Sequence, residues 1–394
     1  MRKVTLIYDC LLSERNGANT VIRQLINNPE LEKKGVFVKS LSPDDWGRVG
    51  VNHDTSSKRA TIKKRIKTLL LWLTRYSSVV TALYLYYFSR VANRIAKEYV
   101  MSNPPLDEVA FFHTLYPCYY YLKHRKTYQP TVLVMHTSGD TFKMFRTYYK
   151  ALEGSLYYKW LLKMEKYVLQ HVDKISFVAE KSAQYFLELH PYVSPNKVSF
   201  IYNGVPDVIS AYRSRQKSDV MEFCCVASIS NRKGQHFIID ALKRFPKDDM
   251  PKVHFTLVGD GPDRQELYND VILFGLDDYI TFAGISQNVD EYLANSDAYI
   301  LPSEDEGLPM AIIEAMRASL PIVSTPVGGI PEMVEQGKNG LLIQPCSKDV
   351  YNLLNHLNDY NWNEMGKQAR LTFENKFTTE KMISGYSKLL TFEE

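Results

Sequence analysis

The fold of this chain is best judged from residues 306–314, whose sequence is Glu306-Gly-Leu-Pro-Met-Ala-Ile-Ile-Glu314. The first glutamate lies in a Gly/Pro loop after an apolar strand predicted at residues 298–302, and the second lies in an amphipathic helix predicted at residues 311–318. Backbone N–H groups at the start of such a helix can hold a phosphate. Glu314 on the same rim can accept two hydrogen bonds from a diol such as a ribose. Two isolated glutamates at this spacing are usually solvated side chains, so the flanking sequence has to decide in favour of a nucleotide-sugar site.

The pattern around this stretch predicts an α/β protein with two similar halves. Short apolar runs alternate with helical patterns, which implies parallel sheets covered by helices on both faces. In the first half the predicted strands are residues 4–8, 36–42, 109–112, 131–135, 174–178 and 197–201. In the second half they are residues 222–226, 254–258, 279–282, 298–301, 322–324 and 340–343. We therefore expect two doubly wound Rossmann-like domains facing a cleft at the carboxyl ends of their strands, joined by the polar stretch at residues 206–219.

The charge distribution is uneven, although the net charge of the 394 residues is only +4. No acidic residue occurs between Asp54 and Glu98, where ten basic residues lie, so the rest of the chain nets −6 (+4 minus 10). The ten are Lys58, Arg59, Lys63, Lys64, Arg65, Lys67, Arg75, Arg90, Arg94 and Lys97. One local basic element on an otherwise acidic protein favours attraction to an anionic surface over general nucleic-acid binding.

The five cysteines and the N-terminus suggest a protein of a reducing compartment. The cysteine number is odd, no C-x-x-C motif occurs, and Cys224-Cys225 lies in a strand-like run, so buried thiols are favoured over a disulfide or a zinc site. No signal peptide precedes the first predicted strand. The best candidate for a membrane span, residues 69–88, is interrupted by Arg75 and several hydroxyl residues. We therefore expect a cytoplasmic protein.

Further motifs surround the glutamate pair in a fixed order. Upstream lie Val226-Ala-Ser-Ile-Ser-Asn-Arg-Lys-Gly234, Leu257-Val-Gly-Asp-Gly-Pro262 and Phe282-Ala-Gly284, and downstream lies a Gly-Gly loop within residues 321–334. Together these motifs resemble the donor half of the GT-B glycosyltransferases, specifically the large retaining family GT4 (glycosyl transferases group 1). Fainter matches extend to the N-terminus, at the asparagine-glycine element of residues 201–206, the strand-end His136 and the loop at Gly17. The resemblance covers most of the chain. Its motifs are specific over about a third of the chain, in the C-terminal half.

The resemblance implies a role for each matching residue. Lys233 and Arg232 would neutralise the donor diphosphate, Glu306 would accept hydrogen bonds from the sugar, and Glu314 would accept them from the ribose. The other expected donor contacts are Gly17, Gly259, Ile285, Gly307, Leu308 and Pro309. His136, Glu306 and Lys233 are the expected catalytic residues, with His136 orienting or polarising a hydroxyl near the anomeric carbon. No cofactor and no metal are implied, because basic side chains stabilise the leaving diphosphate.

The resemblance also implies the domain organisation. Residues 1–205 would form an acceptor-binding Rossmann-like domain and residues 206–375 a nucleotide-sugar-binding one. Residues 376–394 would form a helix that returns to the N-terminal domain. The activity would be retaining transfer of a sugar from a nucleotide-diphosphate donor to a glycan or lipid-linked acceptor, in cell-surface or capsular polysaccharide or glycolipid biosynthesis. The departing diphosphate would itself accept the acceptor's proton.

Some residues leave alternatives open. The family usually has Gly-Arg where this chain has Ala227-Ser228, so Arg232 is a candidate to replace the missing arginine. A strand-end His136 can simply cap a loop, His113 is equally ambiguous, and Asp140 is better explained as a helix cap than as a catalytic acid. Lys233 has the bland alternative of a solvated lysine.

The basic stretch at residues 57–97 also contains leucines, Trp72 and several tyrosines. On a helix this composition suits peripheral contact with an anionic membrane at its cytoplasmic face, although the apolar residues also suit packing on the N-terminal sheet. Rival functions are a nucleotide-sugar epimerase of the same fold and a scaffold subunit of a glycosyltransferase complex. A phosphorylase of this fold needs a much longer chain. Acceptor dependence would argue against the epimerase, and donor hydrolysis would argue against the scaffold.

Overall fold

The computed structural model describes residues 1–14, 17–46, 73–74, 76–208 and 218–393, which pack into two compact units. Unit 1 comprises Met1–Val178, Ala183–Ile201 and Ile383–Glu394, and unit 2 comprises Ala179–Ser182 and Tyr202–Met382. The sequence places domain boundaries after residues 205 and 375, whereas packing places them after residues 201 and 382. The structure describes the arrangement within each unit. The cleft between the two domains therefore stays a prediction.

Unit 1 is built on a parallel sheet of six strands in the order β2-β1-β3-β4-β5-β6. The strands are β1 (Arg2–Ile7), β2 (Val36–Leu41), β3 (Val109–Phe112), β4 (Thr131–Met135), β5 (Lys174–Phe177) and β6 (Val198–Phe200). Every residue of β3 and β4 is buried, because helices cover both faces of the sheet. From β1 the chain builds first to one side, at β2, and then to the other, at β3. The carboxyl ends of β1 and β3 therefore flank the topological switch point.

The helices of unit 1 cover this sheet and hold its core. They are α1 (Gly17–Leu25), α2 (Pro29–Lys33), α4 (Ser78–Met101), α5 (Leu115–His124), α6 (Lys143–Tyr148), α7 (Leu156–His171) and α8 (Glu180–Leu189), with short 3-10 turns η1 (Pro43–Trp46), η2 (Lys150–Leu152) and η3 (Pro195–Lys197). Helix α4 packs on α5 and buries Ile95 and Tyr99 in a core cluster with Phe112 and Phe177. Helix α16 (Thr379–Thr391) places Tyr386 with its ring centroid 6.1 Å from that of Phe111. The predicted return of the C-terminal helix to the N-terminal domain is thereby confirmed.

Unit 2 repeats the plan with the strand order β12-β11-β10-β7-β8-β9. The strands are β7 (Met221–Val226), β8 (Val253–Val258), β9 (Ile280–Gly284), β10 (Ala298–Leu301), β11 (Ile322–Ser324) and β12 (Gly340–Leu342), all in parallel pairs. Here the chain runs from β7 outward to β9 and then starts again on the other side at β10. The carboxyl ends of β7 and β10 therefore flank the switch point, where ligands of open α/β sheets bind.

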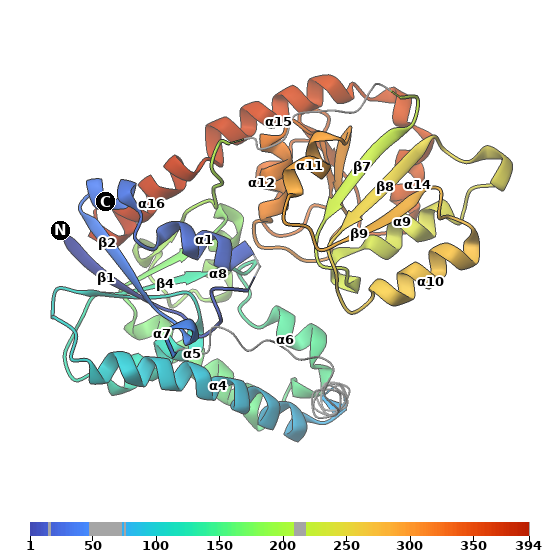
Figure 1. Ribbon diagram of the computed structural model, residues 1–394. Coiled ribbons are helices and arrows are strands. Elements are labelled where there is room, and N and C mark those ends of the chain that lie inside the picture. The colour runs from blue at the N-terminus through green and yellow to red at the C-terminus, as the bar shows by residue number, and fades with distance from the viewer. Residues whose placement is uncertain (15–16, 47–72, 75, 209–217, 394) are drawn as a thin grey trace. The chain divides into compact units, whose positions relative to one another are not determined.

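The helices of unit 2 pack on both sides of its sheet, with α9 against α14 and α12 against α15 (Figure 1). They are α9 (Gln235–Leu242), α10 (Arg264–Phe274), α11 (Val289–Ala294), α12 (Met310–Arg317), α13 (Ile330–Met333), α14 (Ser347–Asn355) and α15 (Trp362–Lys376), with 3-10 turns η4 (Asn231–Lys233), η5 (Lys247–Asp249) and η6 (Leu357–Asp359). The predicted fold class, two Rossmann-like domains with parallel sheets, is confirmed.

Local expectations meet the structure in different ways. Gly17, which the sequence analysis places in a loop, is the first residue of helix α1. All five cysteines are free thiols, and Cys118, Cys224 and Cys225 are buried while Cys10 is exposed. Residues 47–72, which carry six of the ten basic residues, and residues 209–217 of the interdomain link lie outside the described part of the chain.

Candidate functional site

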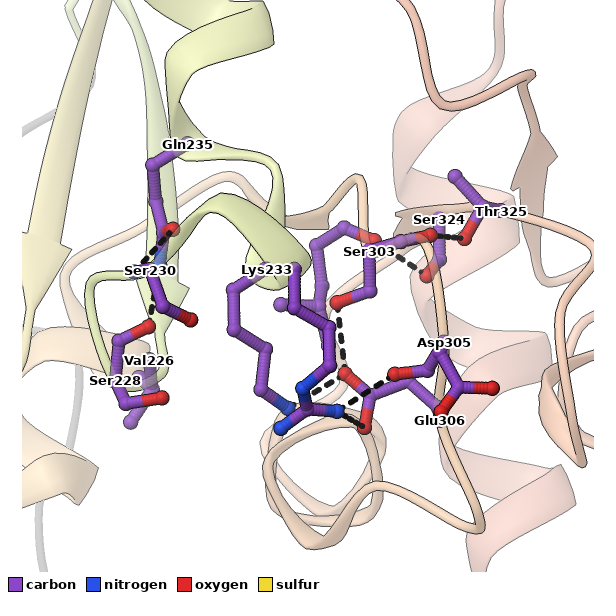
Figure 2. Close-up of polar contacts among 12 residues, drawn as sticks. Val226, Ser228, Ser230, Lys233, Gln235, Ser303, Asp305, Glu306, Ser324 and Thr325 are labelled. Carbon is purple, nitrogen blue, oxygen red and sulfur yellow. Dashed lines mark hydrogen bonds and ion pairs between the residues drawn. The ribbon is translucent and has the colours of Figure 1, made fainter. Parts of the chain in front are cut away.

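Three of the expected site residues meet at the switch point of unit 2. Strand β7 leads into η4, which carries Arg232 and Lys233, and β10 leads into the loop that carries Glu306. Lys233 Nζ donates to Glu306 Oε1 at 2.6 Å, and Arg232 NH1 lies 3.8 Å from Glu306 Oε2. Arg232 also donates to the carbonyl oxygen of Asp305 at 2.7 Å. Figure 2 shows the lysine and the carboxylate pointing toward one another from the two loops.

The ion pair is largely withdrawn from solvent, since the side chains of Lys233 and Glu306 are 14% and 6% exposed. A second donor supports the carboxylate, because Ser303 Oγ bonds to Glu306 Oε1 at 2.7 Å (Figure 2). Withdrawal from water strengthens the attraction but removes hydration from both charges, so loss of either partner strands the other. The two loops thus hold the Lys233 ammonium at a fixed point. An anionic ligand can bind there, either beside the Glu306 carboxylate or in its place.

Two glycines let the loops of this edge lie against one another. At Gly328 the backbone has φ +54°, and an added Cβ would lie 1.8 Å from the carbonyl oxygen of Glu306. At Gly259, with φ +143°, an added Cβ would lie 2.0 Å from the carbonyl oxygen of Ala227. No other residue fits either position without moving the backbone. The sequence assigns Gly259 to donor binding, and the structure gives it a packing role beside the loop after β7.

That loop after β7 is braced by a buried amide. Gln235, only 1% exposed, donates from Nε2 to the Ser228 carbonyl at 3.1 Å, and its Oε1 accepts from the Ser230 N–H at 3.4 Å (Figure 2). Ser228, where the resemblance expects an arginine, is exposed. The two cations that follow on η4 both reach the Glu306 loop. Arg232 is therefore placed where it can take over the missing arginine's charge.

Glu314 lies in α12, half-buried, and its carboxylate makes no hydrogen bond within the described residues. Burial raises the pKa of its carboxyl to about 7, the nearby Arg317 lowers this pKa, and Asp290 raises it. Arg317 is itself ion-paired with Asp290. A half-buried carboxylate that has no hydrogen-bond donor from the protein can accept hydrogen bonds from the diol of a ligand.

The loop between the two glutamates is supported from behind. Pro309 is the N-cap residue of α12 and is buried, and Leu308 is only 4% exposed, so Gly307 is the half-buried residue of this loop. The Leu308 carbonyl accepts from Asn203 Nδ2 at 3.0 Å, and the Gly307 carbonyl accepts from Gly329 N at 2.7 Å. Ile285, the expected base contact after β9, is 71% exposed.

The expected residues of unit 1 lie at the carboxyl edge of its own sheet. His136 follows β4 and His113 follows β3, and their rings are hydrogen-bonded, Nε2 to Nδ1, at 2.8 Å. Asp140 accepts from the Phe142 N–H at 3.1 Å and pairs with Arg146. The N-cap residue of α6 is Phe142, so the prediction of Asp140 as a helix cap is wrong and this carboxylate closes the turn before the helix. Gly17 opens α1. Each unit thus gathers its own expected residues at its own sheet edge.

Four residues that the sequence analysis did not assign take part in these sites. Asn203, Ser303 and Gln235 brace the loops of unit 2, and Asp9 after β1 accepts from Thr114 Oγ1 at 2.6 Å across the switch point of unit 1. Asn203 belongs to the asparagine-glycine element already singled out, so its position carried a signal. Ser303 and Gln235 belong to no motif that the sequence analysis singled out, although their partners lie within seven residues. Asp9 carries no sequence signal because its partner Thr114 lies 105 positions away.

A surface hollow between α9 and α10 is distinct from this arrangement. Its lining is acidic, with Asp240, Asp263, Glu266 and Asp270 beside Asn231 and His236. Carboxylates repel a diphosphate, so this hollow does not suit a phosphorylated ligand. The cationic loop edge at η4 is the better anion site.

Comparison with known proteins agrees with this geometry. Residues 15–207 match a family model described as "Glycosyltransferase Family 4", and residues 221–358 match one described as "Glycosyl transferases group 1". The chain is 28% identical over 230 residues to N-acetyl-alpha-D-glucosaminyl L-malate synthase of Bacillus anthracis, covering 55% of this chain and 60% of that protein. It is 29% identical over 209 residues to UDP-Gal:alpha-D-GlcNAc-diphosphoundecaprenol alpha-1,3-galactosyltransferase of Escherichia coli, covering 49% and 53%. The chain thus spans only 60% and 53% of these relatives' lengths.

A solved structure extends the likeness to the whole fold. HepE of Anabaena in complex with UDP has a TM-score of 0.68 at 16% identity, covering 99% of this chain and 100% of that one. At this identity the likeness shows the fold, which is the GT-B fold of two Rossmann-like domains. With its two matched domains, the chain belongs to the glycosyltransferases, a family 4 domain being followed by a group 1 domain.

Proposed function

We propose that this protein is a retaining glycosyltransferase that moves a sugar from a nucleotide-diphosphate donor to a glycan or lipid-linked acceptor. The observation that supports it most is the convergence of Arg232, Lys233 and Glu306 at the switch point of unit 2, with Glu314 one helix turn further along α12. A diphosphate would take the place of the carboxylate on Lys233 and use Arg232 as its second cation. Glu306, once released, would accept hydrogen bonds from the sugar hydroxyls.

The chemistry follows from these positions. As the bond between the sugar and the diphosphate breaks, negative charge grows on the leaving oxygen, and fixed cations stabilise that charge more in the transition state than in the ground state. The departing diphosphate would accept the acceptor's proton on the same face of the sugar, which gives retention. We expect no cofactor, and we expect activity to persist in a metal chelator, because Arg232 and Lys233 supply the positive charge.

The relatives suggest where to look for the substrates. HepE is solved with UDP, and the Escherichia coli relative is named for UDP-galactose and a diphosphoundecaprenol-linked sugar. We therefore propose a uridine nucleotide sugar as the first donor to test and a lipid-linked glycan as the first acceptor. The setting would be cell-surface or capsular polysaccharide or glycolipid biosynthesis, with the enzyme at the cytoplasmic face of a membrane.

One surface of unit 1 supports the membrane part of this proposal. Helix α4 exposes Val79, Leu83, Tyr86 and Tyr87 at helical spacing, each 60–67% exposed, and continues into the exposed Arg90. Aromatic and apolar side chains followed by basic ones suit the boundary of an anionic bilayer. In the described ranges, no helix has both the length and the apolar character needed to cross a membrane.

The donor site is tested by thermal unfolding with UDP, GDP, ADP and their sugars, in wild type and in Glu314→Ala. A ligand at 100 times its dissociation constant adds roughly 2.7 kcal/mol of stability. A shift for one nucleotide family that Glu314→Ala removes supports the site and names the base. The anomer released on donor hydrolysis, followed by proton NMR, tests retention. Absence of any shift across the panel would refute the donor assignment.

A further inference from the structure

The strongest feature outside the donor site is a pair of histidines at the carboxyl edge of the unit 1 sheet, of which His113 is buried and His136 half-buried. His113 follows β3 and His136 follows β4, the neighbouring strand, so parallel pairing brings the two rings together. His113 Nδ1 and His136 Nε2 are 2.8 Å apart, and the ring planes are inclined by 21° with centroids 5.1 Å apart. The pair adjoins the switch point, where Asp9 accepts from Thr114.

Both rings are neutral at physiological pH. Burial lowers the pKa of His136 to about 4. Burial also lowers the pKa of His113 well below its ordinary value, and the proximity of His136 lowers it further. A neutral imidazole carries one N–H and one bare nitrogen. A hydrogen bond between the two rings therefore allows only two arrangements, which differ in the ring that donates.

The surroundings of His113 decide between them. Its Nε2 is closed to solvent and has no hydrogen-bond partner among the described residues. Aromatic rings pack around it, with Phe111 at 4.6 Å and Tyr8 at 6.4 Å between centroids. If His136 donated, His113 Nε2 would carry a buried N–H with no acceptor, which is rarer in proteins than a buried acceptor without a donor. His113 Nδ1 therefore donates, and its Nε2 is bare.

We propose that His113 is a positioning residue that holds His136 in the Nδ1–H tautomer, so that His136 acts as a hydrogen-bond donor and not as a base. His136 Nε2 is occupied as the acceptor, and its proton then resides on Nδ1. The ring is half-buried, and within the described residues it makes no hydrogen bond besides that to His113. This inference rests on the proposed function in that His136 contacts an oxygen of the bound substrate. It leaves proton removal from the acceptor to another group.

The tautomer is measured on the unliganded full-length chain by nitrogen-15 NMR of labelled histidine at pH 7. His113→Asn and His136→Gln assign the two signals among nine histidines. We expect His136 to show a protonated Nδ1 and a bare Nε2. A protonated Nε2 on His136 would overturn the proposal, whether or not the chain binds any nucleotide sugar.

Two variants test the consequence for catalysis. In His113→Asn the amide N–H₂ can stand near the place of Nδ1, whereas His113→Phe keeps a planar aromatic ring and loses the donor. We expect His113→Phe to lower kcat by about 10-fold, the effect of one lost hydrogen bond, with the donor KM unchanged. His113→Asn is expected to restore most of that loss. Equal activity of wild type and a folded His113→Phe would contradict the positioning role, and donor binding by both variants shows separately that the proposed function stands.

Discussion

The raised pKa of Glu314 makes donor binding depend on pH. In the free protein its carboxyl titrates at about 7 because burial disfavours the charged form. A diol bound by two donated hydrogen bonds needs the carboxylate, so a protonated Glu314 has to release its proton first. Binding of a nucleotide sugar is therefore expected to weaken as the pH falls through 7.

The magnitude follows from that single titration. With a pKa of about 7, the carboxyl is about 90% protonated at pH 6 and about 10% protonated at pH 8. The apparent Kd is then about 10-fold higher at pH 6 than at pH 8, which corresponds to about 1.4 kcal/mol. At pH 7 binding should release about half a proton.

Isothermal titration with a nucleotide sugar is the suitable assay, because its diphosphate diester has no phosphate that titrates near pH 7. Buffers of different ionisation enthalpy report the released proton. Glu314→Gln should bind more weakly at pH 8 and lose the pH dependence. Glu165→Gln is the matched control, since burial also raises the pKa of Glu165 to about 7 but in unit 1. A Kd in wild type that stays constant between pH 6 and 8 would refute the reasoning.

Further changes have definite expected outcomes. Lys233→Met strands the Glu306 carboxylate with Ser303 and the more distant Arg232, and should lower the free energy of unfolding by about 2–4 kcal/mol in urea titrations. Gly328→Ala should cost more than about 2 kcal/mol because its Cβ meets the Glu306 carbonyl, whereas Gly337→Ala, with φ +75° and open space, should cost about 1 kcal/mol. A larger loss of unfolding free energy in Gly337→Ala than in Gly328→Ala would contradict the packing argument. Glu165→Gln should stabilise the protein at pH 8 by up to about 3 kcal/mol and have no effect at pH 4. Burial raises the pKa of Glu165 from 4.5 to about 7, so the wild-type folded state loses stability relative to the unfolded state as the pH rises between these two values. Tyr86→Ser with Tyr87→Ser should reduce sedimentation with anionic vesicles, and unchanged sedimentation would speak against α4 as the contact.

Much of the fold was accessible from the sequence because strand signals are local. Residues 131–135 consist of Thr131 and a run of four apolar residues that a parallel sheet buries on both faces, and β4 has those bounds. The loop and helix around Glu306 and Glu314 were also predicted, because Gly and Pro punctuate the chain there and the apolar spacing changes to that of a helix.

The contacts within the site were less accessible. Lys233 and Glu306 are 73 positions apart and meet only because β10 pairs with β7 and not with its sequence neighbour β9. Asn203 and Leu308 are 105 positions apart, and their hydrogen bond joins the segment after β6 to the loop before α12. The resemblance to a family named Lys233 and Glu306 as site residues, but it did not show that they are paired with each other.

The sequence by itself determined the strands, the loops after them and the residue types that those loops carry, because hydrophobic period and turn chemistry act over a few neighbouring residues. Only the tertiary structure decided which loops share an edge, since strand order depends on long-range packing. It also decided the state of the groups placed there: burial raises the pKa of Glu314 to about 7 and keeps His113 and His136 neutral. Both effects arise from withdrawal of a charge from water, which the order of residues along a chain does not reveal.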